Sequence, residues 1–150
     1  MRVKMVIVLC FCLAGLACVK GPTPWERSNN ATRLMIIGYT NANIQVAERA
    51  LRDYQRYLIE EESVHYPGSY KYEYAGTTER LIRIFEHQGK TDEAAAFREE
   101  LQRFISNAGD PFATPQEISE LITKVDDAHG WGTSIWTRAT TTTNSPPIKE

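Results

Sequence analysis

The chain has 150 residues, of which 42% are hydrophobic and 24% are charged, proportions that are typical of one ordinary globular domain. A formal net charge of −2 excludes the strongly basic surface that nucleic-acid binding requires. All three cysteines lie at or before Cys18, so a mature chain that begins at or after this residue can form neither an internal disulfide nor a cysteine-based metal site.

The N-terminal residues have the organisation of a signal peptide. Arg2 and Lys4 precede residues 5–19, which carry no charge. This run of about 15 residues is shorter than the ~20 that a membrane-spanning helix needs, and it has the length of the apolar region of a secretory signal. Gly15 and Ala17 are the small residues expected before cleavage at Cys18. A buried core helix over residues 5–19 is the alternative interpretation.

The tetrapeptide Gly15-Leu16-Ala17-Cys18 resembles the lipobox of bacterial lipoproteins. The resemblance implies that residues 1–17 are a lipoprotein signal peptide and that an acylated Cys18 anchors the mature chain to a membrane of the cell envelope. It departs from the family pattern at Gly15, where leucine is usual. Val19 is not the aspartate that retains such proteins at the inner membrane, so the resemblance implies the outer membrane. Ordinary secretory cleavage, which leaves Cys18 as a free thiol, is the alternative.

Residues 18–29 are polar and rich in turn-forming residues, which predicts a flexible tether. We expect an α-helical domain over residues 30–130. A short first helix carries Leu34 and Ile37, and a second helix begins at Ile44 after a turn over residues 39–43. Residues 60–62 are three consecutive glutamates. Because negative charge is unfavourable at the C-terminus of a helix, they predict a solvated, frayed end.

Residues 79–105 contain the strongest helical pattern. Apolar residues recur at spacings of three and four on both sides of Gly89, and so short a connection predicts two antiparallel helices, an αα-hairpin. The break at residues 66–69 precedes this hairpin. Tyr70, Tyr72 and Tyr74 alternate as in a strand, but the helical spacing that continues to Leu81 favours a helix from Tyr70 onward.

The two predicted hairpins show an internal sequence repeat. Arg33 and Ala47 recur as Arg80 and Ala94, and the pattern resembles the tetratricopeptide repeat, especially the repeats of envelope lipoproteins. The resemblance departs at Ile82, where a small residue is usual, and in its longer spacing. It implies a short array of helical hairpins whose first helices line a protein-binding face. The residues it places there are Tyr70, Glu73, Tyr74, Thr77, Arg80 and Arg83, with the alternative that the tyrosines belong to the core.

A last helix and a tail complete the chain. Thr114 and Glu117 form a capping-box pattern around Pro115, and the helix that follows ends at Gly130. This helix is suited to be the terminal cap of a helical array. Together, the predicted elements form an all-α array or bundle of about five helices. We expect residues 131–150 to be mostly disordered. Two tryptophans in this tail, Trp131 and Trp136, are expected to dock on the helices or to form a motif for a partner.

The histidines do not indicate a metal site or a catalytic site. His65, His87 and His129 are far apart in the sequence and match no metal-binding spacing, so we expect no metal, no cofactor and no enzymatic activity. The leading hypothesis is a membrane-tethered, non-enzymatic repeat protein that binds another protein of the bacterial cell envelope. The alternatives are a small periplasmic enzyme or ligand-binding protein with a site between the helices and, third, a purely structural surface lipoprotein.

Overall fold

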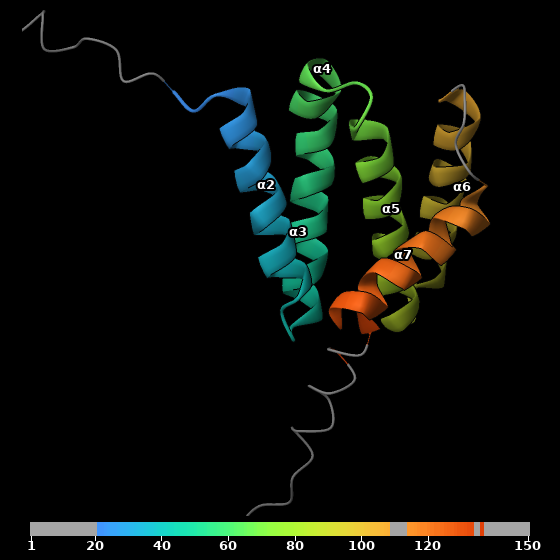
Figure 1. Ribbon diagram of the computed structural model, residues 1–150. Helices are drawn as coiled ribbons and strands as arrows, with labels where there is room; N and C mark the ends of the chain where they lie inside the picture. Colours follow the sequence, from blue (N-terminus) through green and yellow to red (C-terminus); the bar gives the residue numbers. More distant parts are fainter. Residues whose placement is uncertain (1–20, 109–113, 134–135, 137–150) are drawn as a thin grey trace, which may run out of the picture.

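The computed structural model describes residues 21–108, 114–133 and 136, and every regular element in these residues is a helix. The elements are α2 (Pro24–Tyr39), α3 (Ile44–Tyr57), the π-helical turn η1 (Leu58–Glu62), α4 (Ser63–His65), α5 (Tyr70–His87), α6 (Thr91–Asn107) and α7 (Pro115–His129). The α2–α3 and α5–α6 hairpins stand side by side, and α7 crosses α5 and α6 obliquely (Figure 1). The prediction of an all-α fold with two hairpins is confirmed.

Helix α2 begins at Pro24, so the prediction that residues 24–29 belong to the tether is wrong. The Oγ1 atom of Thr23 accepts a hydrogen bond from the Glu26 amide (3.2 Å), and the Glu26 carboxylate accepts one from the Thr23 amide (2.7 Å). This capping box, together with proline at the first helical position, starts a helix by satisfying amides that otherwise lack partners. The pKa of the Glu26 carboxyl is lowered by the hydrogen bonds that it accepts from the Thr23 amide and, secondly, from the Thr23 hydroxyl (2.9 Å).

The glutamates at positions 60–62 do not form a frayed end, because the chain continues helically through η1 to His65. Glu62 is buried and accepts a hydrogen bond from the Tyr57 hydroxyl (2.9 Å). Burial, together with this bond, raises the pKa of Tyr57 to about 12. Glu61 pairs with Arg27 at a distance of 3.2 Å, which links the end of this long helical segment to α2.

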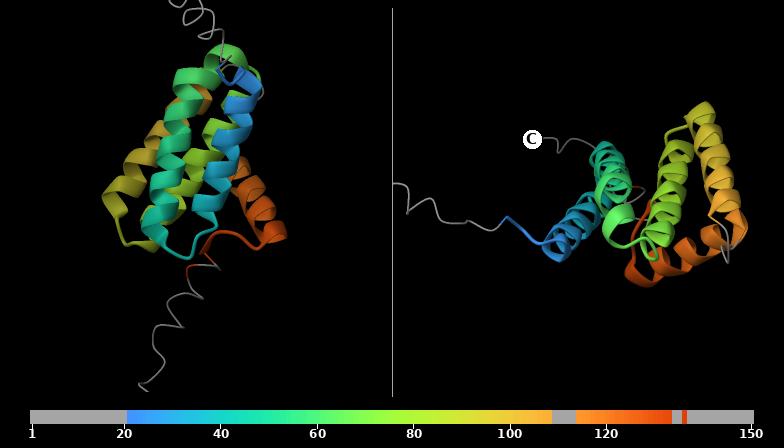
Figure 2. Two further views of the ribbon diagram at one scale, coloured as in Figure 1. Left: turned by 90° about the vertical axis from the view of Figure 1, so that its left-hand side faces the viewer. Right: turned by 90° about the horizontal axis from the view of Figure 1, so that it is seen from above.

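Helix α5 is the centre of the fold, between α3, α6 and α7 (Figure 2). It is helical from Tyr70, which excludes the strand interpretation, and its side chains are buried almost without interruption from Tyr74 to Phe85. A Cβ atom on Gly76 would lie 2.9 Å from the Cδ1 atom of Ile122, so this glycine allows α7 to approach the α5 backbone. The largest fully buried side chains are Tyr39, Leu51, Leu58, Leu81, Ile84, Phe85 and Leu101.

Candidate functional site

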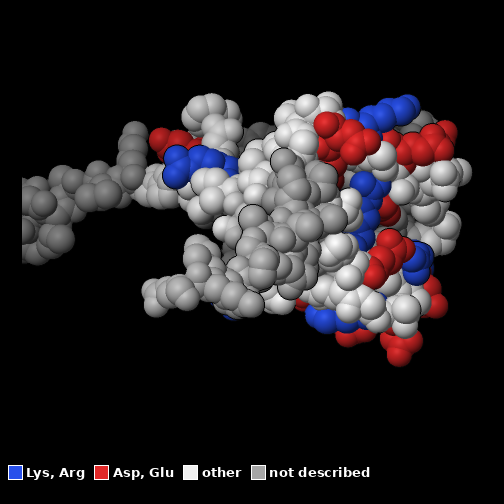
Figure 3. All heavy atoms as spheres, turned by 90° about the horizontal axis from the view of Figure 1, so that it is seen from below, with Lys and Arg blue, Asp and Glu red and all other residues white. Residues whose placement is uncertain are grey.

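A groove of about 580 Å³ opens between α5, α6 and α7. The buried side chains of Ile82 and Leu101 lie at its floor. The remaining lining is mainly polar and consists of Glu79, Arg83, Glu86, Arg98, Gln102, Pro115, Gln116 and Ser119. Figure 3 shows acidic and basic side chains interspersed over the half of the visible face that contains these helices. The groove therefore offers charges of both signs and side-chain amides around a small apolar floor.

A hydrogen-bonded network fixes the wall of the groove where α5 meets α7. Glu79 and Arg83 stand one turn apart on α5, and the Glu79 Oε1 atom accepts hydrogen bonds from Arg83 Nε (3.0 Å) and from the Ser119 hydroxyl (2.8 Å). The Nη2 atom of Arg83 donates to the Ser119 carbonyl (2.7 Å) and to the Thr123 hydroxyl (2.8 Å). These bonds hold the polar side chains in one arrangement, which reduces the conformational entropy that binding must remove.

The opposite wall, formed by α6, is more open. Arg98 pairs with Glu86 across the α5–α6 hairpin, and both side chains are about half exposed. Gln102 is exposed on the same helix. Gln116, at the start of α7, donates a hydrogen bond to Glu120 (2.9 Å). Side-chain amides can donate to and accept from a peptide backbone simultaneously, so this rim is suited to polar recognition rather than to nucleophilic chemistry.

A buried charged cluster connects three helices near the C-terminal end of α7, away from the groove lining. The Asp126 carboxylate of α7 accepts hydrogen bonds from Arg80 of α5 (Nη2, 2.7 Å; Nε, 3.1 Å) and from the Tyr39 hydroxyl of α2 (2.6 Å). The Arg80 and Asp126 side chains are only 8% and 4% exposed. Burial, and secondly the Asp126 charge, raises the pKa of Tyr39, so the hydroxyl remains a donor. Each charged group of the cluster has its partner, which indicates a structural role.

The residues after α7 close over this cluster. Gly130 and Gly132 both have positive φ angles, of 67° and 76°, and the Trp131 amide donates to the Asp126 carbonyl (2.8 Å). A Cβ atom on Gly132 would lie 3.1 Å from the Tyr39 hydroxyl. Trp136 is buried against the ring of Tyr39, with 5.8 Å between ring centres. The expected docking of the tail tryptophans is therefore found, with Trp131 stacked on His129.

The six residues predicted to line a protein-binding face do not share one open surface. Arg80 is buried on Asp126, and Tyr74 and Thr77 are buried in the core, so the alternative that the tyrosines belong to the core is correct for Tyr74. Burial, and then its hydrogen bond to Glu100, raises the pKa of the Tyr74 hydroxyl. Of the six, Arg83 alone lines the groove between α5, α6 and α7.

The other two predicted residues lie toward the start of α5. Tyr70 packs edge-on against Phe104 with 6.2 Å between ring centres. Glu73 accepts a long hydrogen bond of 3.4 Å from the Tyr54 hydroxyl. Sequence reasoning missed the groove residues Glu79, Glu86, Arg98, Gln102, Gln116 and Ser119. The pairing of Glu79 with Arg83 could have been predicted from their spacing, since charges at i and i+4 pair on a helix. The position of α7 could not be predicted from the sequence pattern.

Some of the predicted features lie outside the part of the chain that the structure describes. Cys18 and the signal-like residues 1–17 lie outside them, as do residues 137–150 of the tail. Within residues 21–108, 114–133 and 136, no group of three or more His, Cys, Asp or Glu side chains is placed to hold a metal ion. None of the helices in these ranges is long and apolar enough to cross a membrane.

Comparison with known proteins yielded no family model, no curated protein and no solved structure that matches this chain. The class of protein is therefore defined by the fold and the groove: an all-α protein built from two helical hairpins and a crossing helix, with a polar groove between the second hairpin and that helix.

Proposed function

We propose that the protein is a membrane-tethered, non-enzymatic helical-hairpin protein that binds a polar segment of another protein of the bacterial cell envelope. The observation that carries this proposal is the groove between α5, α6 and α7. It combines an apolar floor with amides and charges of both signs, the composition that a peptide segment with mixed charges requires.

The proposed tether comes from the sequence. If Cys18 is acylated, the linker between it and the first residue of α2, Pro24, spans at most about 20 Å. Two or more acyl chains hold a protein firmly on a bilayer, because each buried methylene contributes about 0.8 kcal/mol. The helical domain would then remain close to the membrane surface, where its partner is another envelope protein. A Cys18→Ser variant should lose the acyl chains and leave the membrane fraction, and mass spectrometry of the mature N-terminus should detect acylation in the parent protein.

Site-specific photo-cross-linking in cells tests the binding surface. A photoreactive residue is placed at Gln102 or Gln116 in the groove, or at Gln45, which is exposed on α3, as the control. Both groove positions should capture the same protein and the control position should not. Arg98→Glu should reduce that capture, whereas Arg103→Glu, also on α6 but outside the groove lining, should not. Equal capture at all three positions, or no capture at Gln102 and Gln116, would refute the proposal.

The groove volume supports a second candidate, a small ligand-binding protein or enzyme, because about 580 Å³ falls within the range of small-molecule sites. A polar ligand bound there would stabilise the native state by mass action. A screen of small polar metabolites by thermal unfolding distinguishes the candidates. A ligand whose effect on Tm is abolished by Arg98→Glu and retained in Arg103→Glu would favour this second function.

A further inference from the structure

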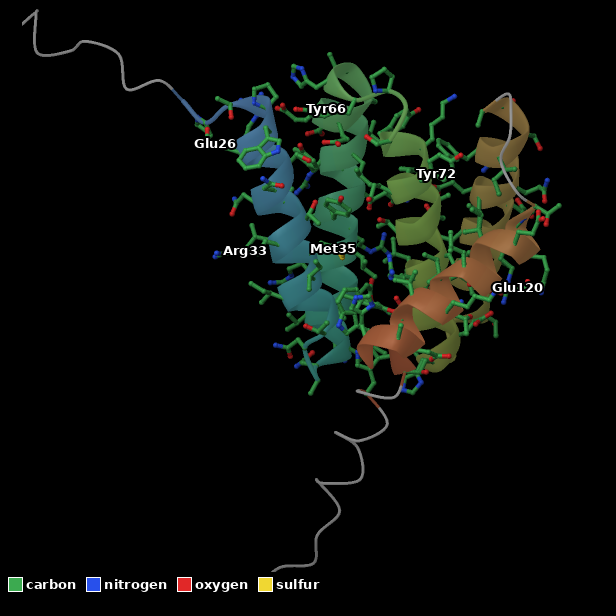
Figure 4. The ribbon with its side chains drawn as sticks, in the orientation of Figure 1. Glu26, Arg33, Met35, Tyr66, Tyr72 and Glu120 are labelled. Carbon is green, nitrogen blue, oxygen red and sulfur yellow. The ribbon has the colours of Figure 1, made fainter. Side chains whose placement is uncertain are left out.

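The outer face of the α2–α3 hairpin contains an apolar groove of about 380 Å³, separate from the polar one. The left view of Figure 2 looks onto this hairpin, with α5, α6 and α7 behind it. In Figure 4, Met35 points between α2 and α3, whereas Arg33 points outward. The apolar lining of the groove is formed by Ala31, Leu34, Met35, Ile37, Gly38, Val46 and Ala50.

This groove is bordered by large exposed hydrophobic side chains. Leu34, Ile37 and Val46 are 54%, 55% and 42% exposed. Single exposed hydrophobic residues are common, but a continuous group around a groove is typical of an interaction surface. An array of helical hairpins normally ends in a polar face that keeps it soluble. The groove on the outer face of α2–α3 is instead mainly apolar, with Arg49 and Asp53 as the charged residues that line it.

The charges beside the groove indicate what covers it. Arg49 and Asp53 lie one turn apart on α3, and both line the groove. Arg49 has no ion-pair partner within the described part of the chain, while Asp53 pairs with Arg56 (2.7 Å) at an exposed position. If two α3 helices pack antiparallel about a two-fold axis that passes midway between Arg49 and Asp53, Arg49 of each copy faces Asp53 of the second copy, because an isologous interface applies every contact twice.

We propose that a second copy of this chain covers the apolar groove, so that the protein forms a two-fold homodimer through its α2–α3 hairpins. The apolar side chains of each copy bury those of the other, and the two Arg49–Asp53 pairs set the antiparallel orientation. A lipid surface fits this groove less well, since helices that lie on membranes have a polar face rich in Lys and Arg, whereas here an acid accompanies the base. This inference uses a different face from the proposed partner groove and does not depend on it.

The size of the face predicts a reversible dimer. A helix of the length of α2 extends about 24 Å and two adjacent helices are about 20 Å wide, which gives on the order of 500 Å² per copy. Stable interfaces bury about 800 Å² per partner. We therefore expect a dissociation constant of about 10–100 µM rather than a permanent assembly.

Sedimentation equilibrium of the full chain over a range around these concentrations tests the proposal. Arg49→Asp or Asp53→Arg alone should weaken the dimer about tenfold, because each places like charges together at two positions. The double variant R49D/D53R should restore the parent affinity, since it exchanges the two charges across the axis. Arg103→Glu on α6 is the matched charge control and should have no effect. Circular dichroism checks that every variant is folded.

A second pair of variants tests the apolar contacts independently of the charges. Ile37→Lys should weaken the dimer at least tenfold, whereas Val64→Lys, at a position that is 70% exposed on α4, should not. A monomer throughout the concentration range would overturn the proposal. So would association that Ile37→Lys leaves unchanged, or a double charge variant no tighter than the single ones. Binding of monomers to phosphatidylglycerol vesicles through Ile37 would assign the face to a membrane instead and would equally overturn it.

Discussion

Replacement of Asp126 by alanine should be among the most destabilising single changes in this protein. It removes the counter-ion of Arg80, whose side chain is only 8% exposed, and the acceptor of the Tyr39 hydroxyl. Removing one partner of a buried ion pair costs about 3–5 kcal/mol, since the remaining charge is left uncompensated in a region of low polarity. A domain of this size has a total stability of about 5–15 kcal/mol, so Asp126→Ala should remove roughly a fifth of it or more.

Urea unfolding followed by circular dichroism measures this loss, and the neighbouring residue provides the control. Asp127 is exposed, so Asp127→Ala should change the free energy of unfolding by less than about 0.5 kcal/mol. The double variant R80M/D126L should be more stable than D126A, because it removes both charges together. If D126A unfolds at the same urea concentration as D127A, or if the double variant is no more stable than D126A, the reasoning from buried charge is wrong.

Three other changes test the packing and the ionisation of the fold. Ile122→Ala should cost about 2–5 kcal/mol because Ile122 is buried against α5, whereas Leu121→Ala, at a position 50% exposed, should be nearly neutral in the same urea titration. Gly38→Ala should cost about 1–3 kcal/mol, because its Cβ atom would overlap that of Ala50 on α3; a lower Tm that a second change, Ala50→Gly, partly restores would identify this contact as the cause. The pKa of Tyr57 is raised to about 12 from an ordinary value of 10.0, first by burial, so its contribution to stability is present below pH 10 and lost as the pH rises through 12. Urea unfolding as a function of pH should show a smaller loss over that range in Tyr57→Phe, and an identical pH dependence in both proteins would contradict this assignment.

The sequence predicted the elements that depend on local patterns. Gly89 closes the first helix of the α5–α6 hairpin with a φ angle of 72°, as expected of a glycine between two helical stripes. Thr114 and Glu117 form the predicted capping box. The start of α2 was misjudged although its signal was equally local: Thr23 and Glu26 form the same kind of box, but Ser28, Asn29 and Asn30 are also residues that cap helices.

The candidate site was less predictable because it depends on the path of α7. The periodicity of α5 identified Tyr74 and Arg80 as residues of a helix. A helical pattern, however, does not predict which other helix packs against each of its faces. Gly76 permits the close approach of α7, and Asp126 then occupies the position at which Arg80 was expected to meet a partner protein.

For this protein, then, the amino-acid sequence alone determined the helical class, the positions of the turns and most helix ends, since these follow from residue spacing and from capping interactions within a few residues. Only the tertiary structure decided which polar side chains are used internally and which remain open. Arg80 and Arg83 look alike in the sequence, yet one is buried on Asp126 and the other lines a groove. The physical reason is that burial of a charge depends on partners distant in the chain, and those partners are brought together only when the helices pack.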